Sequence, residues 1–309
     1  MRYRPLGKTG LQVSILGFGA SPLGGVFGAI DEAEGIRAVH AAFDLGINFV
    51  DVSPYYGLTR AETVLGKALR QRPRDSCILA TKVGRYGDAA FDFSAARVGR
   101  SVEESLRRLQ VETIDLLQCH DIEFGSLDQI VEETLPALRK VVEQGKARFL
   151  GITGLPLKIF PYVLDRTEVD TVLSYCHYTL NDTSLETRLP YLEQKGVGII
   201  NAAPLAMGLL TERELPSWHP APETLRAACA RAAAHCRSRG ADIAQLALQF
   251  SLANPRIATT LVGMAGVAEV QQNAAWSEDP PDPALLSEVQ ALLAPVHDLT
   301  WPSGKPENQ

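Results

Sequence analysis

Short apolar runs, mostly rich in β-branched residues, alternate along the whole chain with longer segments of helical spacing. These runs are nearly continuous rather than alternating, which is typical of parallel strands covered by helices. Eight such strands, each followed by a helix, predict a closed (β/α)8 TIM barrel. The predicted strands are residues 15–19, 47–51, 78–82, 115–119, 149–152, 172–176, 198–202 and 259–263. The predicted helices are residues 32–45, 61–69, 94–109, 127–143, 157–164, 184–195, 243–252 and 267–274.

Several boundaries of these helices have a local chemical cause. Ser94 and Ser184 are predicted N-caps, because a serine hydroxyl can accept a hydrogen bond from an otherwise unpaired backbone amide. Gly46, Gly145 and Gly196 stand where helices are expected to end, since glycine tolerates the left-handed backbone found there.

Two segments lie outside the repeating pattern. Residues 3–14 contain a GKTG turn between extended stretches and predict a β-hairpin that caps one end of the barrel. Residues 212–239 follow the seventh strand and predict a long loop and helix insertion, of the kind that often forms a lid or a binding loop. We expect residues 1–309 to form a single barrel domain.

The composition of the chain excludes some classes of binding partner. The net charge is −6 over 309 residues, which argues against a nucleic-acid or anionic-membrane partner. No run approaches the roughly 18 apolar residues of a membrane span, and no apolar stretch follows the basic residues near Met1, so no secretory signal is expected. The five cysteines include no CxxC pair, which fits a reducing cytoplasm. A monomer or small homo-oligomer is expected.

Three consecutive predicted strands end in an acid, an amine and an imidazole: Asp51, Lys82 and His120. In barrel enzymes the reacting groups lie at the carboxyl ends of the strands, so these side chains are expected at one mouth. Tyr56 follows in the motif DVSPYYG, where a proline and a glycine are expected to bend the chain back over that mouth. Each residue alone has an ordinary structural explanation. The four together favour a catalytic site.

These four residue types suit proton transfer at a carbonyl or an alcohol. A tyrosine hydroxyl has a pKa of about 10, and the ammonium of Lys82 is expected to stabilise the phenolate and lower the pKa of Tyr56. Asp51 would compensate the lysine charge, and His120 would orient the substrate oxygen. Because the set contains no electron sink, a hydride carrier has to bind as a cofactor.

Three other kinds of chemistry fit less well. The stretch GFGASPLGG resembles a dinucleotide fingerprint, but Pro22 stands at the third glycine position. A metal site built from His120, Asp51 and Asp121 has no HxH or HExxH spacing to support it, so no metal is expected. Cys119 and His120 do not make a nucleophile pair, because adjacent strand residues point to opposite faces.

The chain resembles the aldo-keto reductases over nearly its whole length, in LGKTGLQVSILGFGASPLG, GINFVDVSPYYG, ILATKVGRY, DLLQCHD, GITGLPL, APLAMGLL and LVGM. The resemblance implies that Tyr56 is the general acid/base, that Lys82 and Asp51 tune it, and that His120 orients the substrate. It also implies a nicotinamide cofactor that lies extended across the barrel mouth. The residues implied to bind that cofactor are Gly19, Thr153, Gly154, Tyr175, Pro204, Leu205, Met207, Gly208, Gly263, Met264, Glu269 and Asn273.

The chain departs from the family pattern in the nicotinamide pocket. Thr153 and Gly154 stand where most members have Ser-Asn, Ala202 stands where many members stack a tyrosine, and the usual glutamine is absent from LSYCHY. The resemblance further implies that Gly208 leaves backbone amides free to donate to the pyrophosphate.

The charge pattern predicts NAD rather than NADP. No lysine or arginine occurs between Arg256 and Lys305, whereas Glu269 puts a negative charge near the start of the last barrel helix. A carboxylate can accept hydrogen bonds from a free ribose, but it disfavours a 2′-phosphate. A basic residue from the insertion would reverse this preference; Arg213, Arg237 and Arg239 are the candidates.

The expected substrate is a small sugar. Aromatic faces with interspersed polar groups suit a sugar ring, and the candidates above the strand ends are Tyr55, Tyr86, Phe124, His177 and Trp218. The stretches SYCHYTLND, LPSWHPAP and LTWPSG are similar to those of family members that oxidise an aldose such as L-galactose at C1 to its lactone. The alternatives are an NADP-dependent enzyme for another aldose or aldehyde, a metal-dependent barrel isomerase or hydrolase, and a non-catalytic cofactor-sensing subunit.

Overall fold

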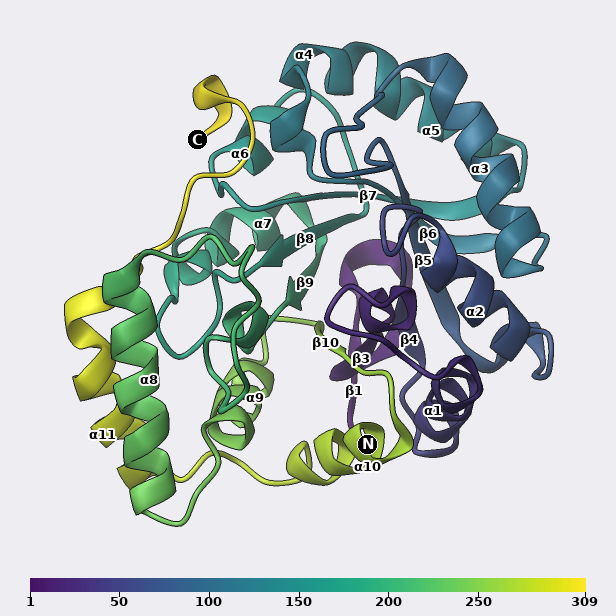
Figure 1. The fold of residues 1–309 in the computed structure, drawn as a ribbon. Coiled ribbons are helices and arrows are strands. Elements are labelled where there is room, and N and C mark those ends of the chain that lie inside the picture. The colour runs from purple at the N-terminus through teal and green to yellow at the C-terminus, as the bar shows by residue number, and fades with distance from the viewer.

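In a computed structural model that describes residues 1–309, eight parallel strands close into a barrel in the order β10-β3-β4-β5-β6-β7-β8-β9 (Figure 1). The predicted (β/α)8 barrel is therefore confirmed. The strands are β3 (Leu16–Gly19), β4 (Phe49–Asp51), β5 (Ile78–Val83), β6 (Ile114–Cys119), β7 (Ala147–Gly154), β8 (Thr171–Tyr175), β9 (Gly198–Ala202) and β10 (Thr259–Gly263).

Helices surround the barrel near the predicted positions. They are α1 (Glu32–Asp44), α2 (Arg60–Leu69), α3 (Ala95–Leu109), α4 (Leu127–Gln129), α5 (Leu135–Glu143), α6 (Ile159–Leu164), α7 (Leu189–Lys195), α9 (Ile243–Ala253) and α10 (Val267–Trp276). The predicted helix 127–143 contains one π-helical turn, Ile130–Thr134, between α4 and α5. Helix α11 (Pro283–Leu293) was not predicted.

The predicted helix ends are mostly confirmed. The Ser94 hydroxyl accepts a hydrogen bond from the Arg97 amide, so this residue is the N-cap of α3. The N-cap prediction for Ser184 is wrong, because its hydroxyl donates to the Asp182 carboxylate at 2.5 Å and the segment begins as a 3-10 turn. The glycines that follow α1, α5 and α7 all have left-handed backbones.

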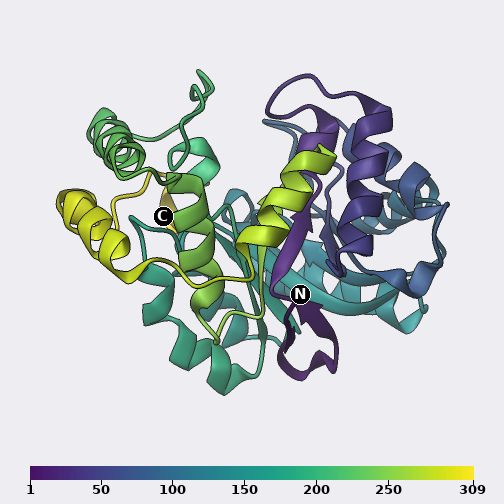
Figure 2. The ribbon, with the colours of Figure 1, turned by 90° about the horizontal axis from the view of Figure 1, so that it is seen from below.

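The predicted hairpin caps the amino-terminal end of the barrel. Strands β1 (Tyr3–Pro5) and β2 (Gln12–Ser14) pair antiparallel. Leu6 is fully buried against Phe49 and Leu116 inside the barrel. Arg4 donates to the backbone carbonyls of Leu252, Asn254 and Ile257. Figure 2 shows this hairpin at one end of the barrel and the long loops after β3 and β9 at the other.

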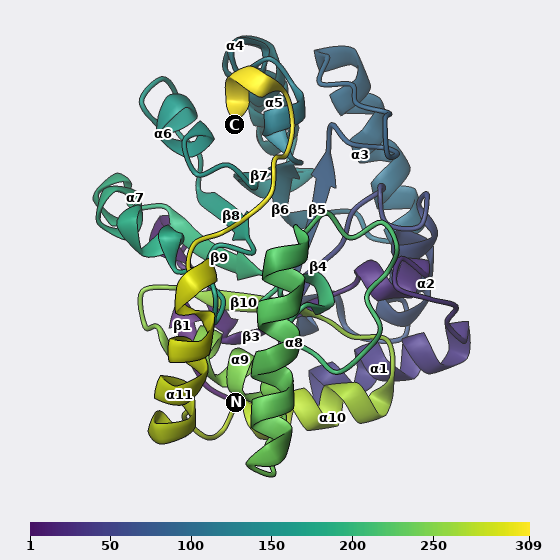
Figure 3. The same ribbon diagram turned by 60° about the vertical axis from the view of Figure 1, so that its left-hand side comes forward.

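The predicted insertion after the seventh barrel strand, β9, is also present. It contains the loop 211–222 and helix α8 (Glu223–Ser238), which packs side by side with α11 (Figure 3). Beyond α11 the chain runs across to α4 and α6. There the Lys305 amide and the Asn308 side chain both donate to the Glu123 carbonyl, at 2.9 and 2.8 Å. The last residues of the chain are thereby fixed beside the barrel mouth.

Candidate active site

The alternation of side chains along the strands decides what faces the interior of the barrel. On β6, Leu116 packs inside the barrel, whereas Leu117 and Cys119 pack outward against the helices. His120, the next residue after Cys119, therefore points inward. The same alternation places Lys82 of β5 and Asp51 of β4 on the inside, two residues beyond inward-facing Ala80 and Phe49. Three chemically active side chains consequently meet at the carboxyl end of neighbouring strands.

Lys82 is the centre of this group. Its ammonium is almost fully buried and donates to the Asp51 carboxylate, to the Val52 carbonyl at 3.0 Å and to the Tyr56 hydroxyl at 3.1 Å. The turn after β4 brings Tyr56 back over the mouth, where its ring stands edge-on to the His120 ring at 5.7 Å. The structure thus brings together all four residues that the sequence singled out.

The acidity of Tyr56 differs from the sequence expectation. Burial raises the pKa of Tyr56 to about 12, and the Lys82 charge only partly offsets this effect. The expectation of a lowered Tyr56 pKa is therefore wrong for the protein without a cofactor. Burial would lower the pKa of Lys82, but the charges and hydrogen bonds of Asp51 and Tyr56 together outweigh it and raise that pKa. Lys82 is an ammonium and Tyr56 a phenol at neutral pH.

His120 is held as a neutral ring. Burial lowers the pKa of His120 to about 3. Its Nδ1 lies 3.0 Å from the Ser53 hydroxyl, which already accepts a hydrogen bond from the Tyr55 amide at 3.1 Å. Ser53 is then free to donate its proton to Nδ1, which leaves Nε2 as the protonated nitrogen. His120 can thus offer a neutral N–H to a substrate oxygen.

The sequence analysis did not identify the residues that hydrogen-bond to the four central residues and orient them. The Gln118 amide donates to Asp51 at 2.8 Å, and Ser53 orients His120. Both lie two residues from a member of the group, so the two-residue period of a strand could have found them. It also missed an ion pair between Arg85 and Asp121, 2.5 Å apart, at the rim of the mouth.

Several predicted cofactor residues come together in one cavity. A cavity of about 220 Å³ lies at the carboxyl end of β10. It is lined by Leu205, Thr211, Glu212, Arg213, Asp242, Ala244, Val262, Gly263, Glu269, Gln272, Asn273 and Trp276. Gly19 pairs with Gly263 between β3 and β10. A Cβ added at Gly263 would approach Pro22 to 3.0 Å, so a larger residue there would press on the Pro22 ring.

The remaining predicted cofactor residues have other surroundings. Thr153 accepts from the Asp121 amide at 2.9 Å, and the Tyr175 hydroxyl lies 3.3 Å from Glu123. Gly154 faces the Glu123 carboxyl, which stands where a side chain at 154 would be. Met264 is fully buried in the layer between the strands and the helices, so the structure does not bring its side chain to the mouth.

The loop after β9 has an unusual backbone. Ala203, Ala206 and Met207 all have left-handed dihedrals, although none is a glycine. Such runs turn successive backbone amides toward one side and form anion-binding concavities. The Gly208 amide itself donates to the Leu205 carbonyl at 3.0 Å. Pro204 lies within this turn, directly after Ala203.

The insertion does bring an arginine to the cavity at the carboxyl end of β10. Arg213 forms an ion pair with Glu269 at 2.9 Å. Arg237 and Arg239 are instead paired with Glu212 and with Glu288 on α11. Only one of the three arginines that the sequence left open lines the cavity.

The predicted substrate residues divide into two groups. Tyr55 lies 6.0 Å from the His120 ring, and Phe124 stacks on Phe91 at the same rim. The other residues are held elsewhere. The Tyr86 hydroxyl accepts from the Gly84 amide, and the buried His177 is bound to Asp182 at 3.0 Å.

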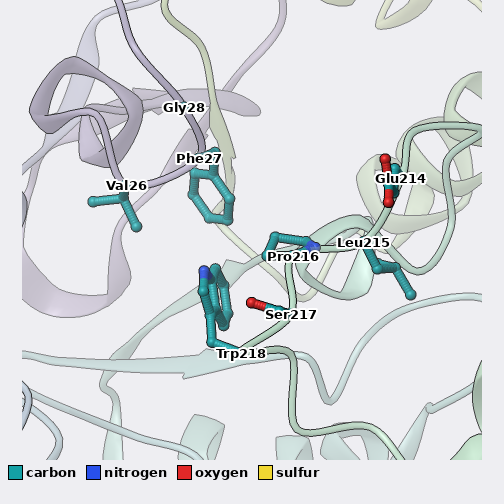
Figure 4. A pocket seen from close by; sticks show the side chains of 8 residues that line it. All are labelled: Val26, Phe27, Gly28, Glu214, Leu215, Pro216, Ser217 and Trp218. Atoms are coloured by element: carbon teal, nitrogen blue, oxygen red, sulfur yellow. The ribbon is translucent and has the colours of Figure 1, made fainter.

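Trp218 lies on the insertion loop and lines a cavity to which none of the four central residues contributes. Its ring packs against Phe27 of the loop after β3 at 5.9 Å, and half of its surface is exposed. Both rings line a cavity of about 410 Å³ that also includes Glu214 and Pro216 (Figure 4). Two loops from opposite sides of the mouth therefore meet here.

The alternative chemistries find little support. Burial raises the pKa of the Cys119 thiol, and its side chain packs among the helices on the opposite face from His120. Within the whole chain, no group of three or more His, Cys, Asp or Glu side chains is placed to hold a metal ion.

None of the helices has both the length and the apolar character that crossing a membrane requires.

The family follows from sequence and fold together. The model of the Aldo/keto reductase family matches residues 15–294, so the chain belongs to this family of nicotinamide-dependent oxidoreductases. It is 57% identical to L-galactose dehydrogenase of Arabidopsis thaliana, over 99% of this chain and 98% of that protein. It is 30% identical to D-threo-aldose 1-dehydrogenase of a Pseudomonas species, over 87% and 90%. An aldo-keto reductase from Bacillus halodurans, solved in its holo form, superposes with a TM-score of 0.80 at 30% identity and 98% coverage of both chains.

Proposed function

We propose that the protein oxidises an aldose at C1, with NAD as the hydride acceptor and L-galactose as the sugar. The observation that carries this proposal is the buried contact of the Lys82 ammonium with both Asp51 and Tyr56, beside a neutral His120. This is an acid–base group with a donor for the substrate oxygen. The likeness to L-galactose dehydrogenase supports the choice of sugar.

The residues present fit a nicotinamide cofactor. The left-handed loop 203–208 offers an anion-binding backbone, and the adjoining cavity offers carboxylate and amide groups suited to a ribose and an adenine. Glu269 and Asn273 would hold the adenosine, and Thr153 and Tyr175 would hold the nicotinamide. The bound cofactor supplies the acceptor for the hydride.

Each protein group then has a defined task. Tyr56, once deprotonated, takes the proton of the C1 hydroxyl, and the C1–H bond breaks with its electron pair leaving as hydride. The C1–O bond becomes a carbonyl and the product is the lactone. His120 Nε2–H positions the C1 oxygen, while the Lys82 charge stabilises the phenolate. The reverse reduction uses Tyr56 as the acid.

The charges around the cavity support NAD. Three carboxylates line it, from Glu212, Asp242 and Glu269, against the one lining guanidinium of Arg213. Arg213 pairs with Glu269 and Arg237 of α8 pairs with Glu212, so Asp242 leaves the surroundings negative. A dianionic 2′-phosphate would meet an excess of negative charge. A ribose diol can donate hydrogen bonds to a carboxylate.

This assignment predicts a change of cofactor preference in Glu269→Gln. Removing the carboxylate frees Arg213, so the ratio of kcat/KM for NAD to kcat/KM for NADP is expected to fall by about tenfold, which corresponds to about 1.4 kcal/mol. Glu288→Gln removes an arginine-paired carboxylate on α11 and should leave the ratio unchanged. A wild-type enzyme that uses NADP as well as NAD would contradict the argument.

The proposal as a whole is tested by absorbance of the reduced nicotinamide. Purified protein is supplied with NAD or NADP and with a panel of L- and D-aldoses that includes L-galactose and L-fucose. The expected result is the highest kcat/KM with NAD and L-galactose. Turnover of other sugars alone would overturn the substrate, and tight NAD binding without turnover of any aldose would indicate a non-catalytic, cofactor-sensing subunit.

A further inference from the structure

A second charged pair lies directly beside the four central residues. Arg85 follows β5 and Asp121 follows His120 beyond β6, so both belong to the same rim as Lys82 and His120. The Asp121 carboxylate lies 3.6 Å from His120 Nε2, too far for a hydrogen bond. That nitrogen is the donor proposed to meet the C1 oxygen. The Asp121 carboxylate is therefore a close neighbour of the donor proposed for that oxygen.

Aromatic rings fix the guanidinium of Arg85 in position. It stands 3.8 Å from the ring centre of Tyr55, and at 5.4 and 5.3 Å from those of Phe91 and Phe124. Its Nε is buried and has no hydrogen-bond partner. A buried donor without a partner carries a free-energy cost, so its retention beside the reacting groups needs an explanation.

The backbone of Asp121 is strained. Its φ is 49°, in the left-handed region, where non-glycine residues are strained. Thr153 holds it there, because its hydroxyl accepts from the Asp121 amide at 2.9 Å. Asp121 forms an ion pair with the Arg85 guanidinium at 2.5 Å, so the group is a carboxylate. A fixed acceptor and a fixed planar donor thus stand side by side.

We infer that Asp121 and Arg85 recognise the hydroxyls that follow C1, with Asp121 accepting from the C2 hydroxyl and Arg85 donating to the next oxygen. Vicinal hydroxyls present a donor and an acceptor at the spacing of such a pair, and the flanking aromatic faces suit the C–H surface of a sugar. The inference rests on the proposed sugar oxidation and makes the enzyme selective for 2-hydroxy aldoses.

The test compares L-galactose with 2-deoxy-L-galactose. For the wild type, kcat/KM on the 2-deoxy sugar is expected to be about 100-fold lower, since a buried carboxylate then loses its partner. Asp121→Asn and Arg85→Met should each lower kcat/KM on L-galactose by about 30-fold while changing that on the 2-deoxy sugar by less than about threefold. The discrimination between the two sugars would then nearly vanish.

Asp115→Asn is the matched control. Asp115 lies near the amino-terminal end of β6, the strand that Asp121 follows at the other end. It is buried and forms ion pairs with Arg74 and Arg148 at 2.6 and 2.7 Å. Its loss should lower the melting temperature without changing sugar discrimination. Equal losses on both sugars in Asp121→Asn would show a purely structural pair and overturn the inference. A wild-type enzyme that oxidises L-galactose and 2-deoxy-L-galactose with equal kcat/KM would also overturn the inference. Failure of the wild type on every aldose would instead refute the proposed function.

Discussion

Replacing Tyr56 with phenylalanine is expected to lower kcat for sugar oxidation by about 10³-fold, while the Kd for the cofactor stays within about twofold. The substitution removes only the hydroxyl that Lys82 contacts at 3.1 Å and keeps the ring packed edge-on to His120. Proton transfer is lost, whereas the shape of the mouth is kept. Stopped-flow absorbance of the reduced nicotinamide and fluorescence titration with NADH measure the two quantities separately.

The matched control is Tyr191→Phe, which removes a hydroxyl that contacts Asp165 on the outer helices at 2.7 Å. Its kcat should equal that of the wild type. A loss of less than about tenfold in Tyr56→Phe would show that another group transfers the proton, and the assignment of Tyr56 would be wrong.

The pH dependence of the wild type follows from the same residue. Because burial raises the pKa of Tyr56 to about 12, the reactive phenolate is scarce at neutral pH. As long as the pH is below that pKa, the phenolate fraction rises about tenfold for each unit by which the pH increases. We expect kcat for oxidation to rise steadily from pH 7 to pH 10, while reduction, which uses the phenol, stays level. Tyr56→Phe should abolish the rise.

The barrel and the four central residues were accessible from the sequence because each depends on a local rule. The predicted bounds of β9 and β10 match the structure residue for residue, and the inward direction of Lys82 and His120 follows from the strand period alone. Asp51 and Tyr56 share one short motif, so their proximity needed no long-range information. The same rule would have found Gln118 and Ser53.

Most features that the sequence analysis did not predict depend on contacts between residues distant in sequence or on the direction of a side chain. Helix α11 begins at Pro283, the last residue of the proline-rich stretch 280–283. Asp282 as N-cap and Pro283 in the first turn are helix-start signals that could have been used. The contact of Asn308 with Glu123, by contrast, joins residues 185 positions apart. His177 and Tyr86 are aromatic and near the rim, but Asp182 and the Gly84 amide hold them, which no sequence pattern shows.

The net acidity of Tyr56 shows the limit of pairwise reasoning. The sequence suggested a neighbouring ammonium, and the structure places it at hydrogen-bond distance. How deeply both groups are buried is a property of the whole packed mouth, and that burial outweighs the charge of Lys82. The direction of the pKa shift could therefore not be obtained from the identity of the neighbours.

Replacing Lys82 with methionine is expected to affect both folding and activity. The substitution leaves the Asp51 carboxylate buried with only the Gln118 amide at 2.8 Å as a side-chain partner. Removing one member of a buried ion pair lowers the free energy of unfolding by about 3–5 kcal/mol. The phenolate of Tyr56 also loses its cation, so kcat should fall by about 10³-fold. Urea unfolding followed by circular dichroism measures the first effect, and nicotinamide absorbance the second.

The double variant Asp51→Asn/Lys82→Met separates the two effects. Because it removes both charges, it should regain at least about 2 kcal/mol of the stability lost in the single variant, yet it should remain inactive. In the single variant, Asp51 has a folded-state pKa above its unfolded value of about 3.9, so the folded protein binds more protons. Its stability should then rise as the pH falls from 8 to 5, and the double variant should lack this slope. Equal stability of the single and double variants at pH 8 would mean that the buried carboxylate is not paired with Lys82 in solution.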